Sequence, residues 1–213
     1  MHCHTEVEHI PSAAEIETRL EGVCPVKWAK QLVAAAREAA CGKTVLCRDG
    51  LTQLALLIDA VTTGRGSEDD LETIRDIVFV MSEAEGCPLV KKVAAGLRTS
   101  MEIYQEEWFQ HCMRKRCSAL VCEAYYSVYI DPILCKGCHA CVAHAPEGAI
   151  LHGDGMISVI LDDSELKGAG FAESCPCGAI KRSGTVKPRL PDSLVPVGSF
   201  GAAGGTPRRR RRS

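Results

Sequence analysis

The sequence predicts an α+β protein in which a bundle of antiparallel helices precedes a smaller α+β domain. Between Pro25 and His111, apolar residues recur at helical intervals, as on the buried faces of amphipathic helices. From Val128 onward the apolar runs are short and separated by turn residues, which favours strands. The 213 residues are 46 % hydrophobic and 24 % charged, which is ordinary for a globular protein of one or two domains.

Capping residues and apolar periodicity predict five helices. Ser12 with Glu15 forms a capping box for the first, and Pro25 stands in the first turn of the second. Ser67 with Asp70 caps the fourth. The expected helices cover about residues 12–20, 25–40, 51–61, 67–81 and 89–108. The last four are expected to form an antiparallel bundle over residues 25–111, joined by short loops.

A cysteine array after the helical region predicts an iron-sulfur site. Cys135, Cys138 and Cys141 lie on one tight loop, so their sulfurs can converge on three corners of an iron-sulfur cube. Cys175, followed by proline, supplies the fourth thiolate and completes a [4Fe-4S] site. A zinc ribbon is the alternative, but zinc sites usually use two cysteine pairs, not a triple plus Cys-Pro.

An internal repeat sharpens this prediction. Residues 145–150 (APEGAI) recur as residues 175–180 (CPCGAI), which resembles the half-repeat of a bacterial-type two-cluster ferredoxin. In such proteins the fourth cysteine of each half ligates the cluster of the other half. The positions that would bind the second cluster are occupied by Glu165, Gly168, Phe171 and Ala145. One complete ligand set is kept and the other is lost, so we expect a ferredoxin-like domain with one cluster.

The rest of this domain should enclose the cluster. A strand is expected at residues 128–130, and residues 149–151 and 156–161 should form a β-hairpin. The side chains expected to form an apolar shell around the cluster are Ile133, Leu134, Val142, Ile150, Phe171 and Ile180. Such a shell helps to set the reduction potential.

Cysteine usage and hydropathy point to a compartment. No apolar run approaches the roughly 20 residues that cross a bilayer, and the polar N-terminus lacks the apolar core of a signal peptide. We therefore expect a cytoplasmic protein without a membrane segment. Thirteen cysteines in a compartment that keeps thiols reduced favour metal ligation over a disulfide framework.

The helical region also carries a motif. Residues 41–50 have the sequence CGKTVLCRDG, a turn follows at 63–71, and Cys87 lies further on. This order resembles the iron-sulfur-binding helical domain that ends the NADH-binding flavoprotein subunit of respiratory complex I. Flavoprotein subunits of NAD(P)-linked hydrogenases and formate dehydrogenases are similar, and several continue into a ferredoxin domain. The resemblance covers about residues 25–182 and implies a [4Fe-4S] cluster that takes electrons from FMN.

Two departures qualify the resemblance. Thr44 stands at the second ligand position, so only Cys41, Cys47 and Cys87 match the family's four cysteines. This leaves three outcomes open: a [4Fe-4S] cluster with another fourth ligand, a [3Fe-4S] cluster, or no cluster and three small buried residues. The family's flavin- and nicotinamide-binding domains have no counterpart before Cys41, so we expect no FMN or NADH binding of that kind.

The linker and the two ends of the chain are less informative. His111, Cys117 and Cys122 could form part of a structural zinc site or an unmetallated linker. Cys24 and Cys177 are expected to be spare thiols. The N-terminal His2, Cys3, His4 and His9 receive no function. The five arginines at 208–212 are expected to be a solvated tail, because one short basic run without interleaved aromatic residues is weak evidence for nucleic-acid binding.

We therefore expect four segments: an N-terminal extension with a short helix (1–24), a helical iron-sulfur-binding-type bundle with its linker (25–123), a ferredoxin-like domain (124–182) and a disordered tail (183–213). No nucleophile, general base or substrate pocket is apparent, so the chain alone should turn over no substrate. The sequence predicts an electron-transfer subunit of a larger oxidoreductase, with a flavoprotein or another iron-sulfur subunit as partner. Two alternatives stay open: an assembly or redox-sensing module with a structural cluster, and a zinc-stabilised nucleic-acid-binding protein.

Overall fold

The computed structural model describes residues 14, 16, 23–85, 87–168, 170–186 and 188–201. The chain divides into two compact units, Met1–Tyr126 and Ser127–Ser213. This division lies close to the boundary expected after residue 123. Most of the helix expected at residues 12–20, and residues 208–212 of the tail, lie outside the described residues.

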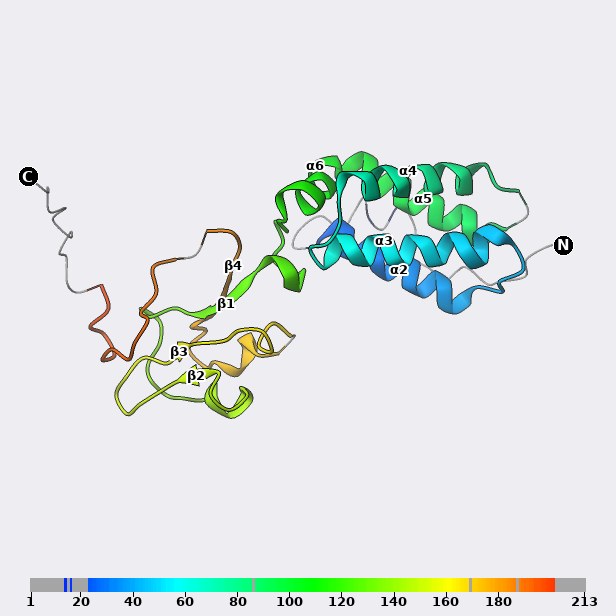
Figure 1. The fold of residues 1–213 in the computed structure, drawn as a ribbon. Coiled ribbons are helices and arrows are strands. Elements are labelled where there is room, and N and C mark those ends of the chain that lie inside the picture. The colour runs from blue at the N-terminus through cyan, green and yellow to red at the C-terminus, as the bar shows by residue number, and fades with distance from the viewer. Residues whose placement is uncertain are drawn as a thin grey trace, which may run out of the picture. The chain divides into compact units, whose positions relative to one another are not determined.

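The first unit is a bundle of four long helices (Figure 1). These are α2 (Pro25–Ala39), α3 (Leu51–Thr62), α4 (Glu68–Glu83) and α5 (Pro88–Ile103). Helix α2 packs against α3 and α5, and α4 packs against the same two helices, so the four enclose one core. The helices predicted at 25–40, 51–61 and 67–81 are confirmed, and the one predicted at 89–108 is confirmed in part.

The starts of these helices follow the expected sequence signals. Ser67 accepts a hydrogen bond from the backbone N–H of Asp70, and the Asp70 carboxylate accepts one from the N–H of Ser67, which is a complete capping box. Pro25 occupies the first turn of α2, and the side chain of Cys24 accepts a hydrogen bond from the backbone N–H of Lys27. Each cap satisfies backbone donors that a helix start leaves unpaired.

The last helix differs from its prediction because Tyr104 leaves the helical conformation. Helix α5 ends at Ile103, and the short α6 (Gln105–Phe109) follows, continued by a π-helical turn, η2 (Gln110–Arg114). The Tyr104 hydroxyl donates to the carbonyl of Ile16 at 2.9 Å. Trp108 of α6 is fully buried and donates its indole N–H to Ser100 Oγ at 3.2 Å. The break thus turns α6 and η2 back onto the core.

One glycine allows close packing inside the bundle. A Cβ atom at Gly96 of α5 would stand 2.9 Å from Leu32 Cδ2 and 3.2 Å from Trp28 Cη2, both on α2. Both distances are shorter than an ordinary carbon–carbon contact of about 3.5–4.0 Å. The missing side chain therefore lets α2 and α5 approach each other, with Leu32 and Trp28 buried between them.

The second unit contains two small antiparallel pairings. Strand β1 (Ser127–Ile130) pairs with β4 (Ile180–Ser183), with Ile130 opposite Ile180. Strand β2 (Ile150–Leu151) pairs with β3 (Val159–Ile160), with Ile150 opposite Ile160. The expected strand at 128–130 and the hairpin are confirmed, whereas β4 was not predicted. The architecture is α+β, as expected.

The prediction that residues 183–213 form a disordered tail is wrong for part of that stretch. Ile157 donates its backbone N–H to the Val195 carbonyl at 2.9 Å, and Val197 donates to the Gly155 carbonyl at 3.0 Å. Met156 and Pro196 form an isolated antiparallel bridge between these two bonds. Backbone hydrogen bonds do not require an apolar run, so the low hydrophobicity of the segment gave no signal of this pairing.

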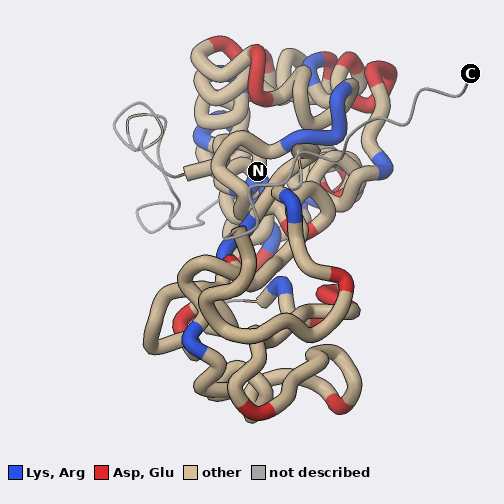
Figure 2. The backbone as a smooth tube through the Cα atoms, turned by 90° about the vertical axis from the view of Figure 1, so that its left-hand side faces the viewer, with Lys and Arg blue, Asp and Glu red and all other residues tan. Residues whose placement is uncertain are grey.

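The distribution of charge and the hydropathy of the helices bear on function. Lys and Arg alternate with Asp and Glu over the helical unit instead of gathering in one stripe (Figure 2). Within the part of the chain that the structure describes, no helix is both long enough and apolar enough to cross a membrane.

Candidate metal centres

The pairing of β1 with β4 brings the two ends of the predicted cluster motif together. Asp131, just after β1, donates its backbone N–H to the carbonyl of Ala179, just before β4, at 2.8 Å. The same Asp131 accepts the backbone N–H of Cys135 at 3.0 Å through its carbonyl. Cys135 and Cys175, far apart in sequence, are thereby held at the same end of the strand pair.

The electrostatics of this region indicate that the expected ligands are neighbours. Burial raises the pKa of the Cys141 thiol, and the nearby Cys135 and Cys175 thiolates raise it further, while a hydrogen bond with Ser158 opposes them. The pKa of Cys177 is raised by partial desolvation and then by the nearby thiolates of Cys138 and Cys175. The expected ligands Cys135, Cys138, Cys141 and Cys175 therefore lie in the same part of the second unit, and their joint binding of one cluster stays a prediction.

The four thiols differ in how far they are exposed to solvent. Cys135 and Cys141 are buried, Cys175 is half-buried, and Cys138 is exposed. The backbone N–H of Ala179 donates to Cys175 Sγ at 3.3 Å, the kind of hydrogen bond that stabilises a thiolate ligand. Of the expected apolar shell, Ile150, Phe171 and Ile180 are buried, Val142 is half-buried, and Ile133 and Leu134 are exposed. The expectation that Ile133 and Leu134 belong to the shell around the cluster stays a prediction.

The helical unit places its three predicted cysteines at one end of the bundle. Cys47 lies on a π-helical turn, η1 (Leu46–Gly50), that contacts α4 and α5, and Cys87 is the residue before α5. Both are buried, whereas Cys41 is exposed. Thr44 Oγ1 accepts the backbone N–H of Cys47 at 3.2 Å. The second ligand position of the motif therefore carries a neutral hydroxyl that is engaged with the backbone.

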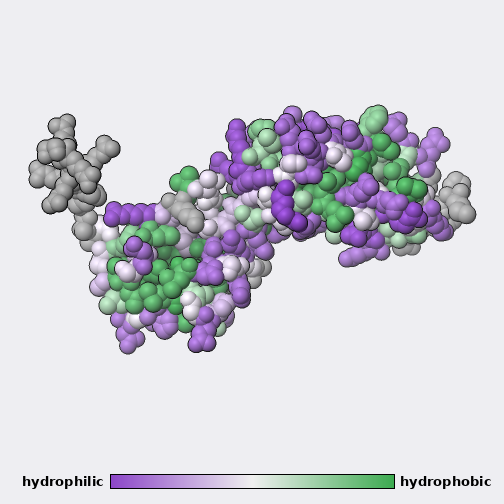
Figure 3. Space-filling view, in the orientation of Figure 1, coloured by the Kyte–Doolittle hydropathy of each residue, from purple (hydrophilic) through white to green (hydrophobic). Residues whose placement is uncertain are grey.

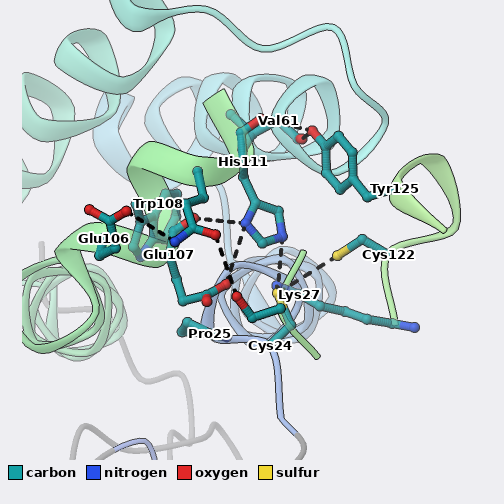
Figure 4. Close-up of polar contacts among 12 residues, drawn as sticks. Cys24, Pro25, Lys27, Val61, Glu106, Glu107, Trp108, His111, Cys122 and Tyr125 are labelled. Carbon is teal, nitrogen blue, oxygen red and sulfur yellow. Dashed lines mark hydrogen bonds and ion pairs between the residues drawn. The ribbon is translucent and has the colours of Figure 1, made fainter. Parts of the chain in front are cut away.

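A third group of ligands is the most compact (Figure 4). The ligand atoms of Cys24, His111, Cys117 and Cys122 all lie within 4.8 Å of one another, and all four residues are buried. Cys24 Sγ lies 3.3 Å from His111 Nε2 and 3.7 Å from Cys122 Sγ. Two thiolates bound to one tetrahedral zinc with Zn–S bonds of about 2.3 Å would be separated by about 3.8 Å. The donor set and its spacing therefore fit one tetrahedral ion.

Neighbouring groups orient the histidine of this site. His111 Nδ1 lies 2.7 Å from the carbonyl of Glu107, and Glu107 Oε2 is 3.8 Å from the same nitrogen. A proton on Nδ1 would leave Nε2 free to bind a metal, the usual arrangement in histidine-ligated sites. The ring also meets Tyr125 edge to face at 5.1 Å, and the Tyr125 hydroxyl donates to the His111 carbonyl at 3.1 Å.

Charge interactions within this group are strong. Burial lowers the pKa of His111, but hydrogen bonds with Cys117 and Cys24 outweigh it and raise the pKa to about 10. Hydrogen bonds from Cys122 and Cys24 lower the pKa of Cys117, and the bond with Cys117 in turn raises the pKa of Cys122. A divalent cation bound here would take the place of the protons that these groups share, so metal binding would release protons.

Cys24 is the functional residue that sequence reasoning missed, because it was interpreted as a spare thiol. It stands before the first residue of α2, whereas the other three ligands follow α6, so no local spacing connects them. The available signal was chemical: His111, Cys117 and Cys122 supply three of the four ligands that a structural zinc needs. Cys112, next to His111, is buried outside the group, and burial raises its pKa to about 11.

Comparison with known proteins assigns the helical unit. Residues 27–111 match the family described as "NADH-ubiquinone oxidoreductase-F iron-sulfur binding region". These residues are therefore similar to an iron-sulfur binding region of this type. The matched region contains Cys41, Cys47 and Cys87 and ends at His111. The resemblance expected from residues 41–87 is confirmed, and the ferredoxin-like domain fused to it stays a prediction.

Two relatives show the context in which such regions occur. The chain is 29 % identical over 126 residues to the NADP-reducing hydrogenase subunit HndC of Solidesulfovibrio fructosivorans, covering 59 % of this chain and 26 % of the relative. It is 27 % identical over 97 residues to the F 2 subunit of the NADH-quinone oxidoreductase of Rhizobium meliloti, covering 46 % of this chain and 23 % of the relative. The chain thus matches about a quarter of the length of these relatives.

Proposed function

We propose that this protein is an iron-sulfur electron-transfer subunit of a multi-subunit oxidoreductase. Its working centre is a [4Fe-4S] cluster held by Cys135, Cys138, Cys141 and Cys175, which takes up and gives away single electrons. The observation that carries the proposal is the β1–β4 pairing, which brings together the two segments that carry Cys135 and Cys175. The iron-sulfur binding region in the helical unit and the relatives in redox complexes support it.

The exposed side of the cluster site suits contact with a redox partner. Cys138 is exposed, and Ile133 and Leu134, directly before the cysteine array, are exposed at 73 % and 39 %. Apolar residues also gather on one face of this unit (Figure 3). An apolar rim beside an exposed ligand lets a partner approach the cluster closely while excluding water. A flavoprotein or another iron-sulfur subunit is the partner class that fits a one-electron carrier.

If the chain only carries electrons, it should turn over no substrate by itself. It should also work in a reducing compartment. Within the described residues the cysteines form no disulfide, and most of those in the helical unit are buried. Reduced thiols of this kind persist in the cytoplasm, where we place the protein.

The test of this function is reversible electron transfer. The anaerobically purified full chain is reduced with dithionite and then mixed with a mild one-electron acceptor such as oxidised benzyl viologen. The proposal predicts that dithionite bleaches the iron-sulfur absorption as each cluster takes up about one electron, and that the acceptor restores this absorption fully. A cluster that is lost on reduction would instead support a redox-sensing or assembly module with a structural cluster.

The compact Cys24–His111–Cys117–Cys122 group supports a second, structural role. We propose that it binds one Zn²⁺, because the donor set is soft, buried and tetrahedrally spaced. The ion would join the start of α2 to the segment that leaves the bundle after α6. Zinc content near one per chain, lost in Cys24→Ser and kept in Cys112→Ala, would support it. Iron at this site, or equal zinc in both variants, would refute it.

A further inference from the structure

In the helical unit, one of the four cysteine ligands of the iron-sulfur site expected from the family is replaced by Thr44. Cys47 on η1 and Cys87 before α5 are 1 % and 3 % exposed, so two thiols of the site are enclosed by the bundle. The turn η1 lies against α4 and α5, so it is held by the bundle. The scaffold of the site is thus present, and the change concerns a ligand and not the fold.

Thr44 cannot act as the missing thiolate. Its hydroxyl accepts the backbone N–H of Cys47, and its carbonyl accepts the N–H of Arg48 at 3.0 Å, so the residue begins the helical turn that carries Cys47. An alcohol is far less acidic than a thiol and remains neutral, which makes it a poor ligand for iron. A four-cysteine cluster therefore does not fit this chain.

No nearby acidic side chain in the loop takes over the role. Asp49 is the one carboxylate of residues 41–50, and it pairs with Arg48 through two hydrogen bonds of 2.9 and 3.1 Å on the exposed surface. The pairing lowers the pKa of Asp49 and commits the carboxylate to the guanidinium. The loop therefore supplies two thiols and no further anionic ligand.

The open side of the site faces solvent. Cys41 is exposed, and Gly42 adopts a left-handed φ of 66° with no atom within 4 Å of the place a Cβ would take. A small donor from solution can therefore reach the side of the site where Thr44 replaces cysteine.

We propose that Cys41, Cys47 and Cys87 hold an iron-sulfur centre with three protein ligands, whose remaining iron is bound by a small external donor and is exchangeable. Hydroxide or a small thiolate is the class of ligand that this iron would take. The centre is distinct from the cluster at Cys135–Cys138–Cys141–Cys175, so this inference stands or fails independently of the electron-carrier proposal.

The chemistry of such a centre is defined and reversible. An oxidant such as ferricyanide removes one electron from [4Fe-4S]²⁺, and the iron without a thiolate leaves as Fe²⁺, which gives [3Fe-4S]⁺. Addition of one electron and one Fe²⁺ restores the original cluster. The four-thiolate cluster of the second unit has no such iron and serves as the internal reference.

The test uses the full chain, reconstituted anaerobically, and the variant Thr44→Cys. Reconstituted native protein should hold about eight irons per chain, lose about one on mild ferricyanide treatment, and show the EPR signal of an oxidised three-iron cluster. Reduction with isotopically labelled Fe²⁺ should return one labelled iron. Thr44→Cys should keep about eight irons and show no three-iron signal, because the fourth thiolate is restored.

Matched measurements make each outcome decisive. Thr73→Cys, on an exposed turn of α4, adds a thiol away from the ligand loop and should behave as the native chain. A native chain that holds about four irons while Thr44→Cys holds about eight would overturn the inference, since the native site would then be empty. The inference would also be overturned if the native chain held eight irons and lost none of them on ferricyanide treatment. Failure of the electron-carrier proposal would appear differently, as loss of the reference cluster in every variant.

Discussion

The sulfur atoms of Cys24 and Cys122 lie 3.7 Å apart although 98 residues separate them in the sequence. Cys24 precedes the first helix of the bundle, and Cys122 follows the last, so the contact closes the helical unit at its two ends. His111, from η2, completes the link at 3.3 Å from Cys24. A metal at this point would hold together the elements that local sequence cannot connect.

Metal removal should therefore destabilise the helical unit. A ligand that binds only the folded state at about 100 times its dissociation constant adds roughly 2.7 kcal/mol, and structural zinc binds far more tightly. Thermal unfolding followed by helix content should shift to lower temperature on treatment with a chelator, and zinc should reverse the shift. Equal melting of the chelated and zinc-loaded chains would contradict a structural ion.

The cluster assignment is tested by two neighbouring cysteines. Cys175→Ala should abolish the ferredoxin-type cluster, because it removes one of the four thiolates and the sulfur that Ala179 N–H stabilises. Cys177→Ala removes an exposed thiol two residues away and should leave the iron content unchanged. Iron, sulfide and visible absorption of both variants check this. Equal loss in the two variants would exclude Cys175 as the specific ligand.

Residues 194–198 pack against the cluster loop at Gly137, so we predict that a side chain at this position destabilises the cluster. Gly137 has φ of 66°, and a Cβ there would stand 2.8 Å from the Met156 carbonyl oxygen and 3.0 Å from Val197 Cγ2. Gly137→Ala should therefore distort the loop between Cys135 and Cys138 and speed cluster loss in air by several-fold.

Gly148→Ala is the control for this effect. Gly148 also has a left-handed φ, of 79°, but no atom lies within 4 Å of the added Cβ, so this variant carries the backbone strain without the clash. The decay of iron-sulfur absorption in both variants is the measurement. If Gly148→Ala loses its cluster as fast as Gly137→Ala, the clash with Met156 and Val197 is not the cause.

The capping box of α4 gives a stability prediction in the helical unit. Ser67→Ala removes both the acceptor for Asp70 N–H and the hydroxyl that donates to the Asp70 carboxylate. The expected loss is about 1 kcal/mol of unfolding free energy. Ser82→Ala, which removes an exposed hydroxyl near the end of the same helix, should cost less than half as much. Urea unfolding of the two variants makes the comparison.

The sequence predicted those features that local pattern encodes. Leu71, Ile74, Val78 and Met81 of α4 are buried as expected, since helical periodicity places them on one face. The strand at 128–130 and the hairpin followed from alternation of apolar and turn residues. The C-x2-C-x2-C array was recognisable because its ligands share one loop.

Features that depend on distant contacts were not predictable in this way. Cys24 was missed because its partners lie at least 87 residues away. The break at Tyr104 was missed because the apolar periodicity continues through it, while its side-chain hydroxyl bonds to Ile16 of another segment. Residues 194–198 pair through backbone groups, which every sequence carries, so their composition indicated only a polar tail.

The central claim is a redox-active [4Fe-4S] cluster at Cys135, Cys138, Cys141 and Cys175. It is tested most directly by iron, acid-labile sulfide and zinc analysis of the anaerobically purified chain, with EPR of the dithionite-reduced sample. The account predicts at least about four irons and four sulfides for this cluster, about one zinc, and an S = 1/2 signal that disappears in Cys175→Ala. Zinc without iron or sulfide would contradict it.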